Sequence, residues 1–339
     1  MVTRAPVHFN ARRLGAPVAR EPAARSTRAR ASFGRSDRVR TYLRPPKLSS
    51  LPRERDQLEF SSRSLVFGRD GDQILRVWGP PERPWALGVE EAGERWRVSA
   101  WGADARTARA AVVELFCLDH PLEEFYRQVR AEPVLAGTER RYRGLRLPRD
   151  ANLYEALVHA VVGQQLSVRA AHTIKQRIIA SAGATVDVEG TEVPRIPTPS
   201  ELVRLGEGGL RSAGASGAKA RSLLGFARRR RSGGLVDAEY AALDSTAAVD
   251  RLDEEPGVGR WTAENALLRG LGRRDLFVAG DLGLRAALER FGAVPRTAPE
   301  GDARAWADRH YPGWGSYATL YLWRRLVAAM AEDARERSP

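Results

Sequence analysis

The chain is 339 residues long, has a single cysteine and is 43% hydrophobic. One cysteine excludes a disulfide framework, an iron–sulfur cluster and a zinc finger, and no run reaches the roughly 18 uncharged apolar residues of a membrane helix. The net charge of +13 is concentrated in residues 1–50, whose 12 Lys/Arg and 2 Asp/Glu leave only +3 for residues 51–339. We therefore expect about two domains, and a claim of nucleic-acid binding must come from motifs.

Residues 1–57 are predicted to be a basic, disordered tail. Scattered Arg, Ala, Ser and Pro follow no sustained helical or strand period there. Such a tail could add affinity for a polyanion such as DNA. The alternatives are a spacer, a start codon placed too early, and a transit-like peptide, which an Arg-rich, acid-poor opening resembles. No apolar stretch of a secretion signal follows the first basic residues, so we do not expect secretion.

Residues 58–135 are predicted to form a small α+β domain with an antiparallel sheet and a connecting helix. The expected strands are short, rich in β-branched and aromatic residues, and separated by Gly and Pro. They are Ser64–Phe67, Gln73–Trp78, Trp85–Val89 and Arg95–Trp101. In the last of these, Trp96, Val98 and Ala100 alternate with polar residues, as in a half-buried strand. A helix from about Asp104 follows, so we expect helices on one face of the sheet.

Residues 136–335 are predicted to be helical, which makes the chain mainly α. Asn152, Ser167 and Ser216 each precede an apolar helical face and can act as N-caps. A Gly/Thr/Pro loop is expected over residues 183–198. Further helices are expected at about 245–253, 260–271, 281–290, 302–309 and 315–331. The arginines Arg228–Arg231 are expected to complement a helix C-terminus in solvent, with phosphate contact as the alternative.

Two of these helices are joined by Pro256-Gly257-Val258-Gly259. Two glycines one residue apart permit a tight turn and let backbone N–H groups approach a ligand without an intervening Cβ. The next helix begins at once, so its free N–H groups and positive dipole end favour an anion, such as one DNA phosphate. An ordinary corner between two helices is the alternative interpretation.

Asp281 ends an apolar run and opens another helix about twenty residues later, where an N-cap is the simplest interpretation. The hairpin followed by an Asp at this distance resembles the helix–hairpin–helix superfamily of DNA glycosylases, in which this Asp is the catalytic carboxylate. Three more segments resemble the 3-methyladenine DNA glycosylase II branch, the AlkA-like proteins. They are Tyr154–Ser167, Ser216–Ala220 and Gly313–Trp323. The resemblance covers residues 60–330 and implies a small sheet domain on a two-part helical domain, with the helix–hairpin–helix at about 245–271.

The resemblance implies a monofunctional DNA N-glycosylase of base excision repair, which flips out an alkylated purine such as 3-methyladenine and hydrolyses its N-glycosidic bond. Asp281 would stabilise the cation that develops at C1′. Trp261 and Trp323 match aromatic positions of the base pocket, and Tyr317 and Tyr321 are nearby candidates. Core packing is the alternative for Trp323 and Tyr321. Trp261 stands where bifunctional relatives carry a nucleophilic lysine, so we expect no AP lyase activity.

The resemblance also implies a set of residues that contact DNA. They are Gly257, Val258, Gly259, Arg260, Thr262, Gln164, Gln165 and Leu166. The wedge that fills the vacated stack falls at Gln165 by strict alignment, with the apolar Leu166 next, and both remain open. Asn265 replaces an aromatic pocket residue of some relatives, which leaves the substrate range open.

We expect no cofactor, because no His/Asp/Glu cluster has the sequence spacing of metal ligands. His159 and His172 are expected to be packed or solvated. The resemblance allows a structural monovalent cation at the backbone carbonyls of Gly257–Gly259. The expected partner is double-stranded DNA with a damaged base, bound by a monomer in the cytoplasm of a bacterium, at the nucleoid, with no membrane contact.

Two other functions remain as alternatives. One is a protein with the glycosylase fold that binds damaged DNA without cutting it, which the presence of Asp281 disfavours. The other is a glycosylase for oxidised or mismatched bases, which the lack of cluster cysteines and of the motif lysine disfavours.

Overall fold

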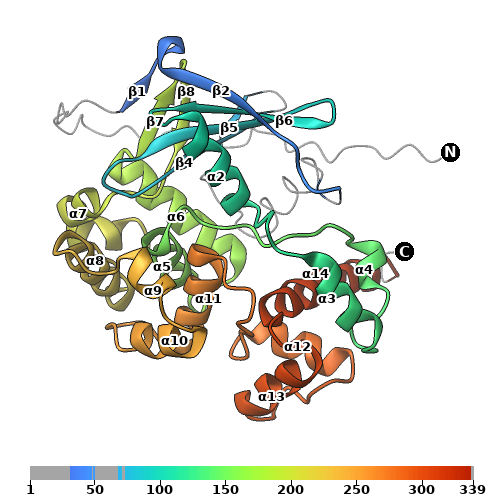
Figure 1. Cartoon of the computed structure of the whole chain (residues 1–339). Helices are drawn as coiled ribbons and strands as arrows, with labels where there is room; N and C mark the ends of the chain where they lie inside the picture. The colour runs from blue at the N-terminus through green and yellow to red at the C-terminus, as the bar shows by residue number, and fades with distance from the viewer. Residues whose placement is uncertain (1–30, 48, 50–67, 71–72, 337–339) are drawn as a thin grey trace. The chain divides into compact units, whose positions relative to one another are not determined.

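The computed structural model describes residues 31–47, 49, 68–70 and 73–336 (Figure 1). The predicted strand Ser64–Phe67 lies outside the described residues. Among the described helices, none has the length and apolar character needed to cross a membrane.

A five-stranded antiparallel sheet is formed by described residues of the N-terminal third, in the order β2-β6-β5-β4-β3. The strands are β2 (Arg38–Leu43), β3 (Gly68–Asp70), β4 (Gln73–Trp78), β5 (Trp85–Ala92) and β6 (Arg95–Trp101). The predictions for β4 and β6 match their bounds, and β5 continues three residues beyond its predicted end at Val89.

The prediction of disorder for residues 1–57 is wrong at β2. This strand pairs antiparallel with β6, from Arg38 opposite Trp101 to Leu43 opposite Trp96. Its side chains are exposed or half-buried, with Val39 and Tyr42 among the exposed apolar ones. An edge strand needs only one neighbour for its backbone hydrogen bonds. It can therefore form without the alternation of buried apolar residues on which strand prediction depends.

The two faces of the sheet are covered by different elements (Figure 1). On one face, the predicted helix from about Asp104 is α2 (Ala105–Leu115), which packs Ala108 and Val112 into a core with Val98. The other face packs against the hairpin of β7 (Thr185–Val188) and β8 (Thr191–Pro194), which forms a second sheet with β1 (Ser32–Phe33) in the order β1-β7-β8.

This hairpin corrects the predicted loop at residues 183–198. Val186, Val188 and Val193 are buried against the larger sheet. Glu189 and Gly190 both have positive φ angles, of 51° and 90°, as in the tight turns that join two antiparallel strands. The valines alternate with polar residues and flank this turn, so the signal was present but was hidden by the surrounding Gly, Thr and Pro.

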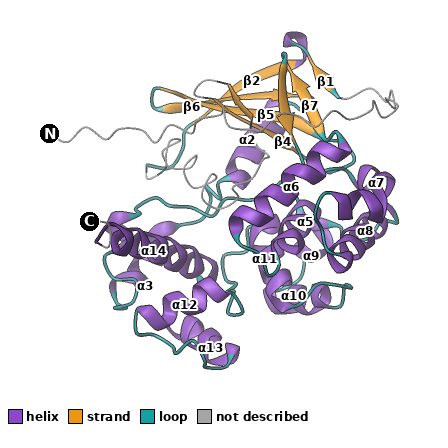
Figure 2. Ribbon diagram, turned by 180° about the vertical axis from the view of Figure 1, so that it is seen from behind, coloured by secondary structure: helices purple, strands orange, loops and turns teal. Residues whose placement is uncertain are grey.

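The helices of the C-terminal two thirds divide between two hydrophobic cores (Figure 2). The first core is built mainly by α5 (Leu153–Gly163), α6 (Val168–Ala182), α7 (Pro199–Ser212), α8 (Gly217–Arg231), α9 (Asp237–Ala241), α10 (Ser245–Asp253) and α11 (Arg260–Leu271). The second is built mainly by α3 (Leu122–Arg130), α12 (Leu282–Arg290), α13 (Glu300–His310) and α14 (Gly315–Glu336), with the short α4 (Thr138–Arg141) in contact with α3.

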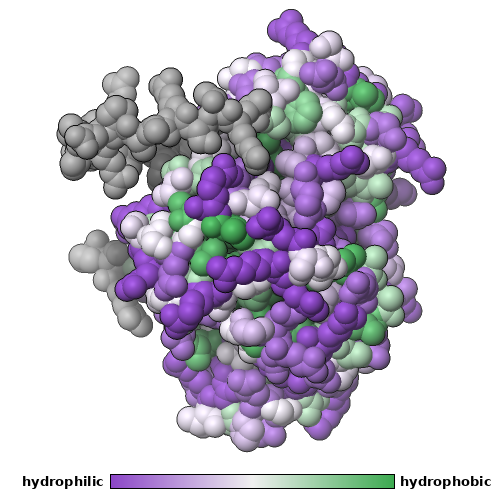
Figure 3. All heavy atoms as spheres, turned by 90° about the vertical axis from the view of Figure 1, so that its left-hand side faces the viewer, coloured by the Kyte–Doolittle hydropathy of each residue, from purple (hydrophilic) through white to green (hydrophobic). Residues whose placement is uncertain are grey.

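The predicted N-caps are confirmed, since the side chains of Asn152, Ser167 and Ser216 accept hydrogen bonds from the first turns of α5, α6 and α8. The predicted boundary at residue 135 differs from the packing, because α3 contributes Phe125 to the core of α12–α14 and not to the sheet. The chain therefore passes from the sheet into the second helical core before it builds the first. On the α7–α8 side, hydrophilic residues cover most of the coloured surface and apolar residues form small separate groups (Figure 3).

Candidate active site

The hairpin between α10 and α11 uses its two glycines differently. Gly257 has a φ of +86°, and a Cβ added there would lie 1.9 Å from Ser222 Oγ, so α8 approaches too closely for any side chain. Gly259 has an ordinary φ of −103°, and a Cβ added there would meet no atom within 4 Å. Packing inside the protein therefore does not require the second glycine. Its exposed position at the start of α11 leaves the free backbone N–H groups open to a ligand.

Gln164 joins the hairpin to the loop that follows α5. Its Nε2 donates to the carbonyl oxygen of Gly257 (3.1 Å) and to Thr262 Oγ1 (2.9 Å). The Nζ of Lys219, in the first turn of α8, donates to the carbonyl oxygens of Val162 (2.9 Å) and Gln164 (2.7 Å). Burial lowers the pKa of Lys219. Three of the segments that resemble glycosylases are thus held together by side chain-to-backbone bonds.

Asp281 precedes α12 and has two kinds of partner. Its Oδ1 accepts from the backbone N–H of Leu284 (2.8 Å), which is the predicted N-cap. The same oxygen accepts from the indole Nε1 of Trp323 on α14 (2.9 Å), and Oδ2 accepts from the indole Nε1 of Trp261 on α11 (3.2 Å). Asp281 is therefore both the N-cap of α12 and the predicted site residue. Its carboxylate is bonded to two tryptophan side chains from different helices.

The segment before Asp281 lies outside any helix or strand, and side chains of α14 bond to its backbone. Ser316, fully buried, accepts from the backbone N–H of Leu276 (3.2 Å) and donates to the carbonyl oxygen of Arg273 (2.7 Å). Thr319 accepts from the backbone N–H of Val278 (3.4 Å). These bonds replace the regular backbone pairing that the segment lacks and define where its carboxylate lies.

The four predicted pocket aromatics do not lie in equivalent places. Trp261 and Trp323 are half-buried and both reach Asp281. Tyr317 and Tyr321 are 0% exposed. The hydroxyl of Tyr317 bonds His120 Nδ1 (2.9 Å), and that of Tyr321 bonds the hydroxyl of Tyr126 (3.1 Å). The two tyrosines therefore form part of the core, and neither presents a ring to a base in this structure.

The predicted DNA-contacting residues also differ in exposure. Gly257, Gly259, Arg260, Gln165 and Leu166 are exposed. Val258 and Thr262 are buried, so their side chains face the protein interior and any contact they make with DNA would be through the backbone. Thr262 instead orients Gln164.

Two apolar side chains near these motifs are exposed, and the sequence did not predict them as site residues. Leu282, directly after Asp281, is 68% exposed, and Val168, close to Leu166, is 56% exposed. Leu166 itself is 39% exposed, and the neighbouring Gln165 has a φ of 53°, in the left-handed region. The available signal was an apolar residue in the first turn of a helix, where side chains often face solvent.

Asp150, Glu155 and His159 bring potential ligand atoms within 4.8 Å of one another, a cluster that sequence spacing did not reveal. The cations Arg76 (2.6 Å from Glu155) and Arg269 (3.3 Å from Asp150) already occupy it. A metal ion would meet their charges, so the residues fit an ion-pair network better than a metal centre. Burial raises the pKa of Glu155 to about 7 and lowers that of His159 to about 4.

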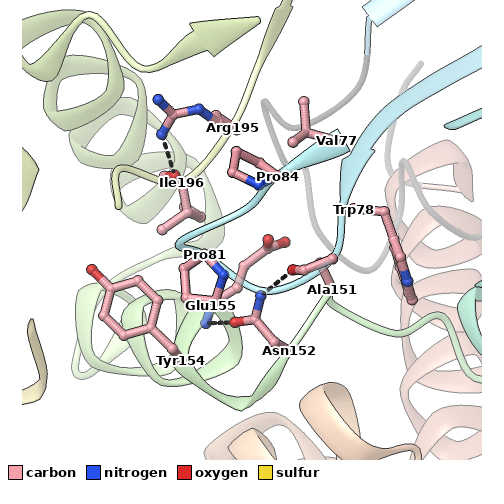
Figure 4. Close-up of a pocket in the computed structure, with 11 residues that line it drawn as sticks. Val77, Trp78, Pro81, Pro84, Ala151, Asn152, Tyr154, Glu155, Arg195 and Ile196 are labelled. Atoms are coloured by element: carbon pink, nitrogen blue, oxygen red, sulfur yellow. Dashed lines mark hydrogen bonds between the residues drawn. The ribbon is translucent and has the colours of Figure 1, made fainter. Parts of the chain in front are cut away.

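A small pocket lies between the β4–β5 turn and the start of α5 (Figure 4). It includes none of the predicted site residues. Asn152 donates to the carbonyl oxygen of Gly79 (2.9 Å), Tyr154 donates to that of Pro197 (3.1 Å), and Arg195 pairs with Glu201 (2.7 Å). These polar groups are engaged within the protein, so the pocket offers little to a ligand.

Residues 158–308 match a family described as HhH-GPD superfamily base excision DNA repair protein. The chain is 30% identical over 213 residues to a DNA-3-methyladenine glycosylase of Bacillus subtilis. The match covers 63% of this chain and 70% of that protein. It is 34% identical to a probable bifunctional transcriptional activator/DNA repair enzyme AlkA of Mycobacterium tuberculosis, over 66% of this chain but only 43% of that longer protein.

Among solved structures, the fold is similar to a 3-methyladenine DNA-glycosylase from Archaeoglobus fulgidus. The TM-score is 0.72 at 24% identity, and the match covers 84% of this chain and 97% of that one. This likeness supports the predicted fold class, a mainly α chain with a small N-terminal sheet.

Proposed function

This chain belongs to the HhH-GPD superfamily of base excision DNA repair proteins, and we propose on that premise that it is a monofunctional DNA N-glycosylase that removes alkylated purines such as 3-methyladenine. The observation that carries the proposal is the Asp281 carboxylate, bonded to the indoles of Trp261 and Trp323. The names of the relatives, DNA-3-methyladenine glycosylases among them, support the class of lesion.

The proposed catalytic group is the Asp281 carboxylate. Cleavage of an N-glycosidic bond develops positive charge at C1′ of the sugar, and a fixed carboxylate stabilises that charge as it forms. Among the described residues, Oδ1 already accepts from two donors, whereas Oδ2 accepts from Trp261 alone. Since an ionised carboxylate oxygen has two acceptor sites, Oδ2 is the oxygen we assign to C1′ or to the attacking water.

Trp261 and Trp323 are the proposed walls of the base site. An indole that donates its N–H to Asp281 keeps its ring next to the reacting sugar. Many alkylated purines are cationic, and a cation over a ring face gains about 0.5–2 kcal/mol. The carboxylate and the rings would therefore both favour a positively charged base.

The proposed DNA contacts are the hairpin and the loop after α5. Exposed Gly259 and the start of α11 offer backbone N–H groups to one phosphate. The adjacent loop carries Gln165 and Leu166 at the surface. An exposed leucine would gain from insertion into a base stack, so Leu166 is the proposed wedge, with Gln165 as the polar alternative.

The proposed absence of AP lyase activity rests on the positions of the amines that could attack C1′. Trp261 occupies the motif position and has no nucleophile. Lys219 Nζ is bonded to two backbone carbonyls, and Lys175 is buried. A Schiff base requires a free amine at C1′, and neither lysine offers one beside Asp281. We also propose that the protein acts as a monomer.

The test is a panel of duplexes that each carry one lesion. Release of free 3-methyladenine, with the strand left intact at an abasic site, is the expected result. Binding to the damaged duplexes without release of any base would replace the proposal with a damage-binding protein. Release of an oxidised or mismatched base alone would replace the lesion class.

A further inference from the structure

Glu264 lies on α11 one turn after Trp261 and is 1% exposed. Its Oε1 accepts from Arg304 Nη1 of α13 (2.6 Å) and from Arg260 Nε (3.2 Å). Burial raises the pKa of Glu264, and the two guanidinium groups oppose that rise. Buried ion pairs are often replaceable by apolar residues without loss of stability. Fold stability alone is thus a weak reason for a carboxylate at this position.

Arg304 makes a second contact with the same nitrogen. Nη1 donates to the carbonyl oxygen of Phe277 (3.1 Å), four residues before Asp281 in the segment between α11 and α12. α13 reaches this segment again at Gly280, where an added Cβ would lie 3.0 Å from the carboxylate of Glu300. One guanidinium therefore connects the helix that carries Trp261 with the segment that carries Asp281.

We propose that Glu264 and Arg304 are positioning residues that set the separation between the Trp261 ring and the Asp281 carboxylate. The direct bond from Trp261 Nε1 to Asp281 Oδ2 is long at 3.2 Å and joins two half-buried groups. The Glu264–Arg304 bond is shorter at 2.6 Å, is charge-assisted and has its carboxylate buried, so it resists displacement better. The inference rests on the proposed glycosylase activity.

The pair should affect lesion preference as well as rate. A shift of α11 against the segment between α11 and α12 would move the Trp261 ring away from the base, while the Asp281 carboxylate would stay near C1′ of the same nucleotide. A cationic base is attracted by both the carboxylate and the electron-rich ring face, whereas a neutral base gains little from this attraction. Since misplacement by about 1 Å can lower a rate about 100-fold, a small shift is sufficient.

The experiment compares Glu264→Gln, Arg304→Met and their double variant with the wild type. Excision is measured under single-turnover conditions on one cationic and one neutral purine lesion in the same duplex. Affinity is measured for a duplex with an abasic-site analogue, and melting temperature for each protein. Glu201→Gln is the matched control, because its pair with Arg195 (2.7 Å) is also partly buried but lies among residues outside the site.

The expected result is a fall of about tenfold or more in excision of the cationic lesion and a smaller fall for the neutral one. Affinity for the abasic duplex should change less than twofold. The double variant should be no slower than the slower single variant, because both changes break one connection. Glu201→Gln should excise like the wild type.

Two results would overturn the inference while leaving the glycosylase intact. One is wild-type rates and lesion preference in Glu264→Gln, the isosteric variant that stays informative if Arg304→Met does not fold. The other is a loss of excision rate that is the same for both lesions, is additive in the double variant and parallels the fall in melting temperature. A wild type that releases no base would overturn the proposed function and this inference together.

Discussion

Asp281→Asn offers the sharpest test of the proposed mechanism, because asparagine is about as good an N-cap as aspartate. The Asn carbonyl oxygen is expected to take the place of Oδ1, where it can still accept from Leu284 N and from Trp323 Nε1. The amide NH₂ then replaces Oδ2 and faces the N–H of Trp261, which lies 3.2 Å from that position. The reverse orientation would set the NH₂ against two donors. Folding should therefore suffer by only about 1 kcal/mol, the usual value of one hydrogen bond.

The chemical step should suffer far more. Removal of one preorganised electrostatic partner lowers rates by about 10²–10³-fold, so single-turnover release of 3-methyladenine by Asp281→Asn should fall by at least that factor. Binding to damaged DNA should persist or tighten, since a negative charge near phosphates is lost.

Asp244→Asn is the matched control. Asp244 caps α10 through Ala247 N at 2.8 Å, as Asp281 caps α12 through Leu284 N. Excision at the wild-type rate by Asp281→Asn, or an equal loss in both variants, would refute the assignment of the carboxylate.

Three further results are expected. Borohydride should trap no covalent complex of the unmodified protein with DNA, because Trp261 has no amine; efficient trapping would refute the monofunctional proposal. Deletion of residues 1–30 should leave excision of saturating substrate unchanged. Deletion of residues 1–57 also removes β2 and should lower the melting temperature of the protein. If the two truncated proteins melt at the same temperature, β2 is dispensable for stability. Burial lowers the pKa of His159 from 6.5 to about 4, so the stability it contributes is present above pH 6.5 and lost as the pH falls toward 4. Between pH 7 and 4.5, urea unfolding should show a greater loss for the wild type than for His159→Gln, by up to about 3 kcal/mol, and parallel losses would contradict this.

Local signals in the sequence were sufficient for the helix ends and for the hairpin. Asn152, Ser167 and Ser216 predicted their helices because an N-cap bonds within its own first turn. Pro256–Gly259 predicted the turn because a turn, like an N-cap, depends on residues next to one another in the sequence. The strands β4 and β6 followed from their composition and from the Gly and Pro between them.

The contacts that build the site are not local. The two indoles that reach Asp281 stand 20 residues before it and 42 residues after it, so no period or spacing predicts that they share a carboxylate. On α14, residues 315–322 are all buried, and a helix buried on every side has no face to distinguish a pocket residue from a core residue. This explains why Tyr317 and Tyr321 were placed with the tryptophans. The pairing of Glu264 with Arg304 depends on how α13 packs and was likewise not predictable.

The β7–β8 hairpin has a consequence for the order in which the protein can fold during synthesis. Val186, Val188 and Val193 complete the core under Leu75 and Val77, more than 100 residues earlier in the chain. When β4, β5 and β6 leave the ribosome, one side of their sheet still lacks its cover. At about 5–20 residues per second, that side stays open to water for several seconds or more. A nascent chain that stalls before the hairpin would expose the apolar side chains of this face, Leu75 and Val77 among them, to water and to other chains.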